Sequence, residues 1–247
     1  MWLWAAELLP AAERTCEVNV NVSLTPAGRK IVPPTKEHPV YYFPFVAGWR
    51  EEGAVMAGEK APARVLFTQP LARALAGQGY LVMGAETPPP TLLLVFHWGA
   101  LNPEIDEVGG ADPDQPQTMF FNRREMLALV GGQKLDALGL NFEREAVMQA
   151  AEDDRYFVIV SAYDYADAVK KKKTLLWQAR MSTPSNGVTM PDVVAALVES
   201  GAPYFGRETA RPEWVRARVR EGSVEVGPIT VVPDAPAEQS GGAAGKK

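Results

Sequence analysis

Apolar and polar residues alternate in several short stretches of this chain, and this period of two is typical of β-strands with one buried face. The clearest alternation runs over residues 18–24, where valines and a leucine alternate with asparagines and a serine. Residues 156–182 hold two further runs rich in β-branched and aromatic residues, joined by a polar connection. We therefore predict a strand at 18–24 and a core β-hairpin at 156–182.

Three other stretches also favour strands. Residues 40–47 are rich in Tyr, Phe and Val, and Pro44 within them predicts an edge or a bulge because proline cannot donate a ladder hydrogen bond. Residues 91–99 are nearly all apolar, which predicts a strand covered on both faces. A shorter strand is predicted at 80–84.

Helical spacing of apolar residues predicts four helices, at 61–76, 120–130, 141–152 and 189–200. The last of these begins at Thr189, with Asp192 three residues on as its capping partner.

Two further predictions concern irregular and C-terminal segments. Residues 101–118 contain three prolines, two glycines and five carboxylates, a composition that predicts a long exposed loop. Residues 212–220 favour one more short helix, and 224–232 a final strand pair.

These elements predict one α+β domain over residues 18–232, with a mixed, mostly antiparallel sheet and helices packed on one face. Residues 101–152 form a loop and helical insertion within it. Residues 1–17 resemble a truncated signal remnant, but they lack a basic start and Glu7 interrupts the apolar stretch. Residues 233–247 are small and polar, which predicts a disordered tail.

Composition and charge exclude several classes of protein. The 247 residues carry a net charge of -5, which argues against a nucleic-acid binder because such proteins usually need a basic surplus. Cys16 is the only cysteine, so no internal disulfide or thiolate metal cluster can form within one chain. It is either a lipid anchor or reactive thiol, or an ordinary structural residue. No apolar run approaches the ~20 residues of a membrane-spanning helix.

Candidate catalytic chemistry rests on two histidines. His97 lies in the apolar strand at 91–99, where a structural histidine is the commoner outcome, and His38 lies in a proline-bounded loop. The chain has no Gly-x-Ser-x-Gly elbow to pair with either. Residues 53–60 have the glycine spacing of a phosphate-binding loop, but Glu59 stands where that loop needs lysine. We therefore expect no cofactor, and His97 is the weak catalytic candidate.

Two clusters of charge suggest binding. In the predicted loop, Asp106, Asp112 and Asp114 could ligate a divalent cation, although their spacing matches no known calcium loop and a solvated loop is the simpler interpretation. A basic cluster consists of Lys170, Lys171, Lys172 and Lys173. These lysines could attract an anionic lipid, nucleic acid or glycan, but in a chain that is acidic as a whole a solvated hairpin tip is the commoner outcome.

The order of elements also suggests a family. A helix ends before Gly79 and Tyr80, an apolar strand follows at 92–99, and the hairpin carries Asp164 and Trp177 ahead of the amphipathic helix at 189–200. This arrangement resembles the bacterial envelope lipoprotein domain known as Domain of Unknown Function 4136. The resemblance covers roughly residues 40–202 and implies an exported envelope protein, with no catalytic residues to carry over. The insertion at 101–152 and the missing lipobox depart from the family pattern.

Three hypotheses follow. The first is a non-catalytic envelope protein with a binding or structural role, located in the periplasm or at the outer membrane, whose partner is another envelope protein or a small ligand. The second is a hydrolase that uses carboxylates or His97 in a pocket that no linear motif reveals. The third is a module that binds anionic surfaces peripherally through its lysines. A cytoplasmic location is the alternative to the envelope.

Overall fold

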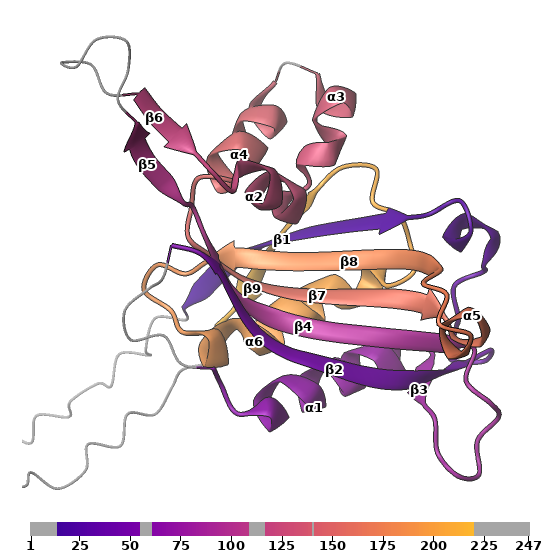
Figure 1. Ribbon diagram of the computed structural model, residues 1–247. Helices are drawn as coiled ribbons and strands as arrows, with labels where there is room; N and C mark the ends of the chain where they lie inside the picture. The colour runs from indigo at the N-terminus through magenta and orange to yellow at the C-terminus, as the bar shows by residue number, and fades with distance from the viewer. Residues whose placement is uncertain (1–13, 55–60, 109–116, 140, 220–247) are drawn as a thin grey trace, which may run out of the picture.

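Seven strands pair into one mixed sheet, in the order β3-β2-β4-β7-β8-β1-β9 (Figure 1). The computed structural model describes residues 14–54, 61–108, 117–139 and 141–219. The strands of this sheet are β1 (Thr15–Leu24), β2 (Val40–Gly53), β3 (Tyr80–Val82), β4 (Leu92–Asn102), β7 (Arg155–Asp164), β8 (Leu175–Pro184) and β9 (Glu213–Arg218). A separate two-stranded hairpin consists of β5 (Ile105–Val108) and β6 (Gln117–Phe120).

Helices and short 3-10 turns connect these strands. The helices are α1 (Arg64–Gly77), α2 (Arg123–Val130), α3 (Leu135–Leu138), α4 (Phe142–Ala150), α5 (Tyr165–Val169) and α6 (Met190–Gly201). The 3-10 turns are η1 (Gly28–Lys30), η2 (Gly132–Lys134) and η3 (Ala202–Tyr204). Strand β2 runs parallel to β3 and β4, and every other pair in the large sheet is antiparallel. The predicted α+β class with a mixed, mostly antiparallel sheet is confirmed.

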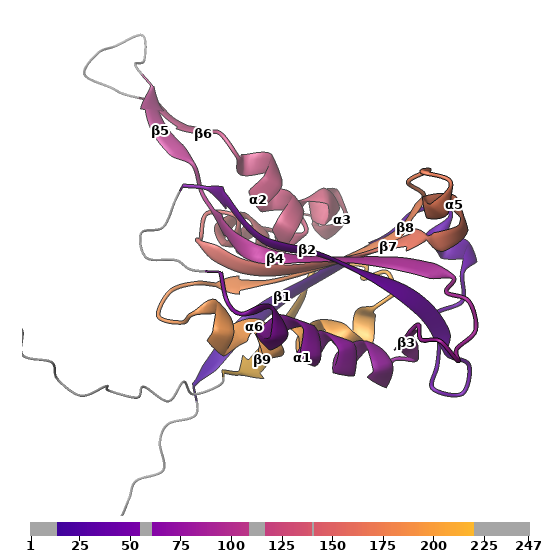
Figure 2. The same ribbon diagram turned by 60° about the horizontal axis from the view of Figure 1, so that its bottom comes forward.

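Helices α1 and α6 pack on one face of the sheet and form the main core with it (Figure 2). Strand β1 contributes Val18, Val20 and Val22 to this core, and all three are fully buried. They are the apolar positions of the alternation at 18–24. Phe67 of α1 stacks on Trp98 of β4, with ring centroids 4.0 Å apart. Burial of these apolar side chains is the main source of the domain's stability.

The amino terminus of α6 is capped as its sequence predicts. The Asp192 carboxylate accepts hydrogen bonds from the Thr189 backbone N–H at 2.9 Å and from the Thr189 hydroxyl at 2.6 Å. Such caps contribute about 1 kcal/mol to helix stability because they satisfy donors that the first turn leaves unpaired. Local sequence therefore determines where α6 begins.

Helices α2, α3 and α4 cover one end of the opposite face of the sheet, and the short helix α5 lies at the other end (Figure 2). The first three come from the predicted insertion, and they form a second apolar cluster with Leu101 and Phe157. Beyond them the face is open, so Leu93 and Val95 of β4 are only partly buried. The prediction that residues 91–99 are covered on both faces was wrong along this part of β4, because in the described residues the insertion helices pack against its end at Leu101.

Two other predictions were wrong. The predicted loop at 101–118 contains the end of β4 and the β5–β6 hairpin, whereas residues 109–116 lie outside the described ranges. Asn122 ties this hairpin to the sheet, since its amide donates to the Asn102 carbonyl at 2.7 Å and its carbonyl accepts from the Glu104 N–H at 2.8 Å. The predicted helix at 212–220 is strand β9, because the outer edge of β1 offers it a complete ladder.

The N-terminal boundary of the domain also differs from the predicted one. Cys16 lies in β1 opposite Ala217 of β9, so the strand begins before residue 18. Partial burial raises the pKa of the Cys16 thiol. Residues 1–13, the predicted strand pair at 224–232 and the predicted tail at 233–247 lie outside the described residues. Within the described part of the chain, no helix has the length and apolar character needed to cross a membrane.

Candidate functional site

The open face of the sheet carries the structure's candidate binding surface. Cross-strand register places Ser23, Gln178, Ser161, Val95 and Phe45 in one row across it. The Gln178 amide donates to the Ser161 hydroxyl at 2.8 Å, so the middle of the row is polar and its β2–β4 end is apolar. Two hollows lie on this face, one over β1 and β8 and the other over β2, β4 and β7.

The first hollow is a groove of about 820 Å³ between α2 and the strands β1 and β8. We call it the arginine groove, because Arg123 and Arg124 of α2 and Arg180 of β8 line it. None of the described residues that line it is an Asp or a Glu. Three arginines therefore line one groove in a chain whose net charge is -5.

The three arginines differ in their partners. The Arg123 guanidinium forms an ion pair with the Glu152 carboxylate, with 4.0 Å between nitrogen and oxygen. Among the described residues, no carboxylate forms an ion pair with Arg124 or Arg180. Burial lowers the pKa of Arg180, because it removes part of the water that solvates the charge. A charge held in this way is stabilised when an anion approaches it.

His97 lines a smaller pocket of about 160 Å³, together with Glu52, Glu125 and Arg180. Its ring meets Phe157 edge to face, with ring centroids 5.8 Å apart. Burial, with smaller effects of Arg50 and Arg180, lowers the pKa of His97 to about 4. Its Nδ1 atom is buried without a hydrogen-bond partner among the described residues.

This setting limits what His97 can do chemically. A general base works best when its pKa lies near the operating pH, and a pKa of about 4 is far below neutrality. No serine, threonine or cysteine is among the described residues that line the pocket, so it offers no hydroxyl or thiol nucleophile. The arrangement fits the structural interpretation of His97 better than the hydrolase hypothesis.

Of the three acidic metal candidates, only Asp106 lies within the described residues. Asp106 lies on β5 opposite Met119, and Asp112 and Asp114 lie outside the described residues. Within the described ranges, no group of three or more metal-ligating side chains occurs.

The lysines follow α5, in a segment where the sequence predicted only a polar connection. Lys170, Lys171, Lys172 and Lys173 are all exposed, as predicted for a hairpin tip. Three of them, Lys171 to Lys173, also line the second hollow on the open face.

The residues that suggested the family resemblance converge in space. Tyr80, Asp164 and Trp177 all line one small cavity of about 270 Å³. Each has a structural role there. The Tyr80 hydroxyl donates to the Phe205 carbonyl at 3.2 Å, Trp177 stacks on Phe205, and the Asp164 carboxylate caps α5 by accepting the Asp167 N–H at 2.8 Å.

Sequence reasoning missed the arginine groove entirely. Arg123 and Arg124 belong to a predicted helix and Arg180 to a predicted strand, with nothing in the sequence to bring them together. One signal was available, because Arg180 interrupts an apolar strand and a charge there must face a solvent-filled or partnered space.

No family model matches this chain, and no curated protein matches it. Among solved structures, a PDZ domain protein from Parabacteroides distasonis is similar with a TM-score of 0.40 and 9% identity, over 83% of this chain and 39% of that chain. Two structures of the PelC dodecamer from Paraburkholderia phytofirmans have TM-scores of 0.33 and 0.34 and identities of 8% and 9%. Each covers 78% of this chain and 99% of that chain. At these values the similarity assigns no function.

Proposed function

We propose that this protein is a non-catalytic binding protein that holds an anionic group of its ligand in the arginine groove. The observation that carries the proposal is that Arg123, Arg124 and Arg180 line one groove whose described lining includes no carboxylate. Guanidinium groups present forked donors that match carboxylate and phosphate oxygens. A groove of about 820 Å³ accommodates a small molecule or a segment of a longer chain.

Replacement of Arg180 by glutamine tests the proposal. Isothermal titration of the full-length protein with citrate and with pyrophosphate is expected to show binding that weakens from about 20 mM to about 200 mM NaCl. Arg180→Gln should weaken this binding about 10-fold or more, since a charge-assisted hydrogen bond contributes about 1.5–3 kcal/mol.

Arg73→Gln is the matched control, because Arg73 is exposed on α1 at the far side of the sheet. It should bind both anions as the wild type does. Equal affinity of the Arg180 and Arg73 variants for both anions would contradict a binding role for the groove.

The proposed location is the bacterial envelope, and the support for it is the resemblance of residues 40–202 to an envelope lipoprotein domain. Fractionation of the source cell with an antibody against the native full-length protein tests it. We expect the protein with the periplasmic or outer-membrane markers. Recovery with cytosolic markers alone would contradict this location and leave the proposed binding role intact.

A further inference from the structure

The second hollow on the open face combines an apolar floor with a basic rim. Its volume is about 510 Å³, and we call it the lysine hollow. Its lining residues belong to β2, β4, β7, α5 and the lysines that follow α5. Figure 1 shows α5 at one end of these strands. Its lining residues are Phe45, Leu93, Val95, Tyr163, Ala168, Lys171, Lys172 and Lys173.

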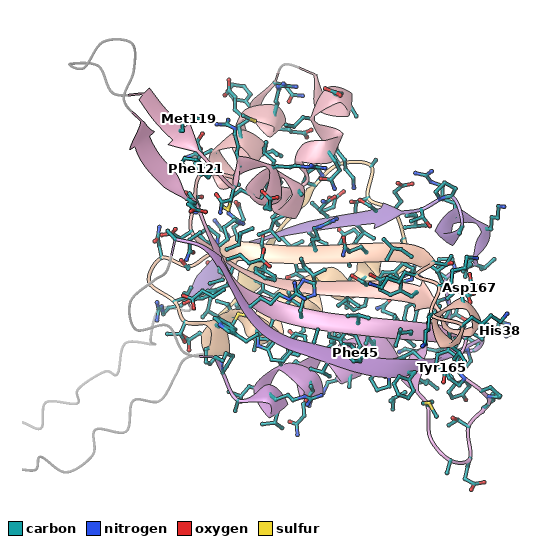
Figure 3. The ribbon with its side chains drawn as sticks, viewed as in Figure 1. His38, Phe45, Met119, Phe121, Tyr165 and Asp167 are labelled. Atoms are coloured by element: carbon teal, nitrogen blue, oxygen red, sulfur yellow. The ribbon has the colours of Figure 1, made fainter. Side chains whose placement is uncertain are left out.

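The floor is apolar and accessible. Register sets Phe45 beside Val95 and Leu93 beside Tyr163, so the apolar side chains continue across three strands. Phe45 is 54% exposed, and Figure 3 shows it on β2, on the open face of the sheet. An apolar surface that spans three strands and remains exposed marks a site where a ligand or partner binds.

The floor extends toward α5 through a second aromatic pair. Phe43 of β2, which is 40% exposed, lies near Tyr165 of α5 with ring centroids 6.0 Å apart. Figure 3 shows Tyr165 and Asp167 together on α5, at the end of the sheet where the lysines lie. The apolar surface and the basic residues therefore meet at one edge of the hollow.

The lysines on the rim differ in their ion-pair partners. Lys172 binds the Asp167 carboxylate at 2.8 Å, and the Thr174 hydroxyl binds the same oxygen at 2.5 Å. Asp167 is therefore the ion-pair partner of Lys172. In the described part of the chain, neither Lys171 nor Lys173 forms an ion pair.

The backbone at Lys171 supports a role for its side chain. Lys171 has a φ of 61°, and it is the one non-glycine residue with positive φ in the described ranges. It follows the carboxyl end of α5, a position that glycine usually occupies because L-residues adopt this conformation at a cost. A non-glycine residue at such a position is consistent with a functional role for its side chain.

We propose that the lysine hollow binds a single-chain anionic amphiphile, with the hydrocarbon chain on the floor and the carboxylate or phosphate head group between Lys171 and Lys173. A neutral amphiphile would gain no attraction from the two exposed ammonium groups, and a small inorganic anion would leave the floor exposed. The occupant is one molecule in a concave site and not a flat bilayer surface. The volume lies within the roughly 300–1,000 Å³ of small-molecule pockets.

Calorimetry on the full-length protein with matched ten-carbon probes tests this. Decanoate and decyl phosphate, below their micelle concentrations, are expected to bind one molecule per chain at least about 10-fold more tightly than decyltrimethylammonium. Inorganic phosphate alone should bind far more weakly, because it buries no hydrocarbon. Binding of decanoate should show a negative heat-capacity change, the mark of apolar burial.

Two variants separate binding from folding. Lys171→Gly removes one charge and suits the positive φ, so it should weaken decanoate binding about 5-fold without lowering the melting temperature. Val95→Thr keeps the size of the side chain but places a hydroxyl group in the apolar floor, so it should weaken the binding of decanoate about 5-fold. Lys30→Gln, an exposed lysine in η1, is the control and should bind as the wild type does.

Three results would overturn the proposal. The first is equal affinity for the anionic and cationic amphiphiles. The second is sedimentation with phosphatidylglycerol vesicles in the absence of monomer binding, which would indicate a bilayer as the partner. The third is loss of decanoate binding in Arg180→Gln with no effect of Lys171→Gly, which would place the amphiphile in the arginine groove. The titrations with citrate and pyrophosphate test the arginine groove separately. The proposal for one site can therefore be contradicted while the proposal for the other stands.

Discussion

Replacing Gly99 by alanine is expected to destabilise the fold by about 3 kcal/mol, at the upper end of the effects of overpacking. Gly99 lies in β4, and a Cβ atom there would overlap the backbone carbonyl oxygen of Arg50 on β2. That oxygen belongs to the strand and cannot move without separating β2 from β4. Denaturation in urea, followed by circular dichroism, measures the loss as a shift of the midpoint.

Gly77 supplies the control for this experiment. It is the last residue of α1, and a Cβ atom there would meet no atom within 4 Å. Gly77→Ala should therefore leave the stability unchanged or raise it by up to about 1 kcal/mol, because alanine restricts the unfolded chain. A Gly99→Ala midpoint that matches the wild type would show that β2 and β4 are not packed as closely as described.

The pH dependence of stability is the second large effect, and it is expected to come from His97. Its pKa falls from the ordinary histidine value of 6.5 to about 4 in the folded state, so the unfolded chain takes up this proton first. Stability is then lost as the pH falls from about 6.5 to about 4, and this residue contributes no further loss below that range. The shift corresponds to at most about 3 kcal/mol, reduced in practice because the ring is only partly buried.

Comparison of the wild type with His97→Phe isolates this contribution from the carboxylates that titrate at lower pH. The phenyl ring keeps the edge-to-face contact with Phe157 and takes up no proton. The difference in unfolding free energy between the two proteins should therefore change between pH 7 and pH 4, in favour of the variant at pH 4. Parallel pH profiles would show that His97 is not desolvated in the folded state.

The open face explains why two hollows occur side by side. Helices α1 and α6 cover one side of the sheet, whereas the insertion helices cover only one end of the other. The remaining surface is therefore a floor of strands with basic groups at two places, on α2 with β8 and beyond α5. Both proposed sites depend on this incomplete coverage, and each uses different arginines or lysines.

Local features of the sequence determined much of the fold. The β7–β8 hairpin, the alternation in β1 and the cap of α6 at Thr189 follow from the period of apolar residues and from the chemistry of neighbouring residues. The assignment of β9 could not be made in this way, because a six-residue segment does not distinguish a strand from a helix by periodicity. Its pairing with β1 joins opposite ends of the described chain.

For the candidate sites too, the sequence determined one part and the tertiary structure the other. The sequence alone identified His97 as a structural histidine candidate and placed the four lysines at an exposed hairpin tip. Only the tertiary structure brought Arg123 and Arg124 to Arg180, and only it placed Phe45 and Val95 beneath the lysines. The physical reason is that local sequence sets the conformation of each strand and helix, whereas pairing register and helix packing decide which distant side chains become neighbours.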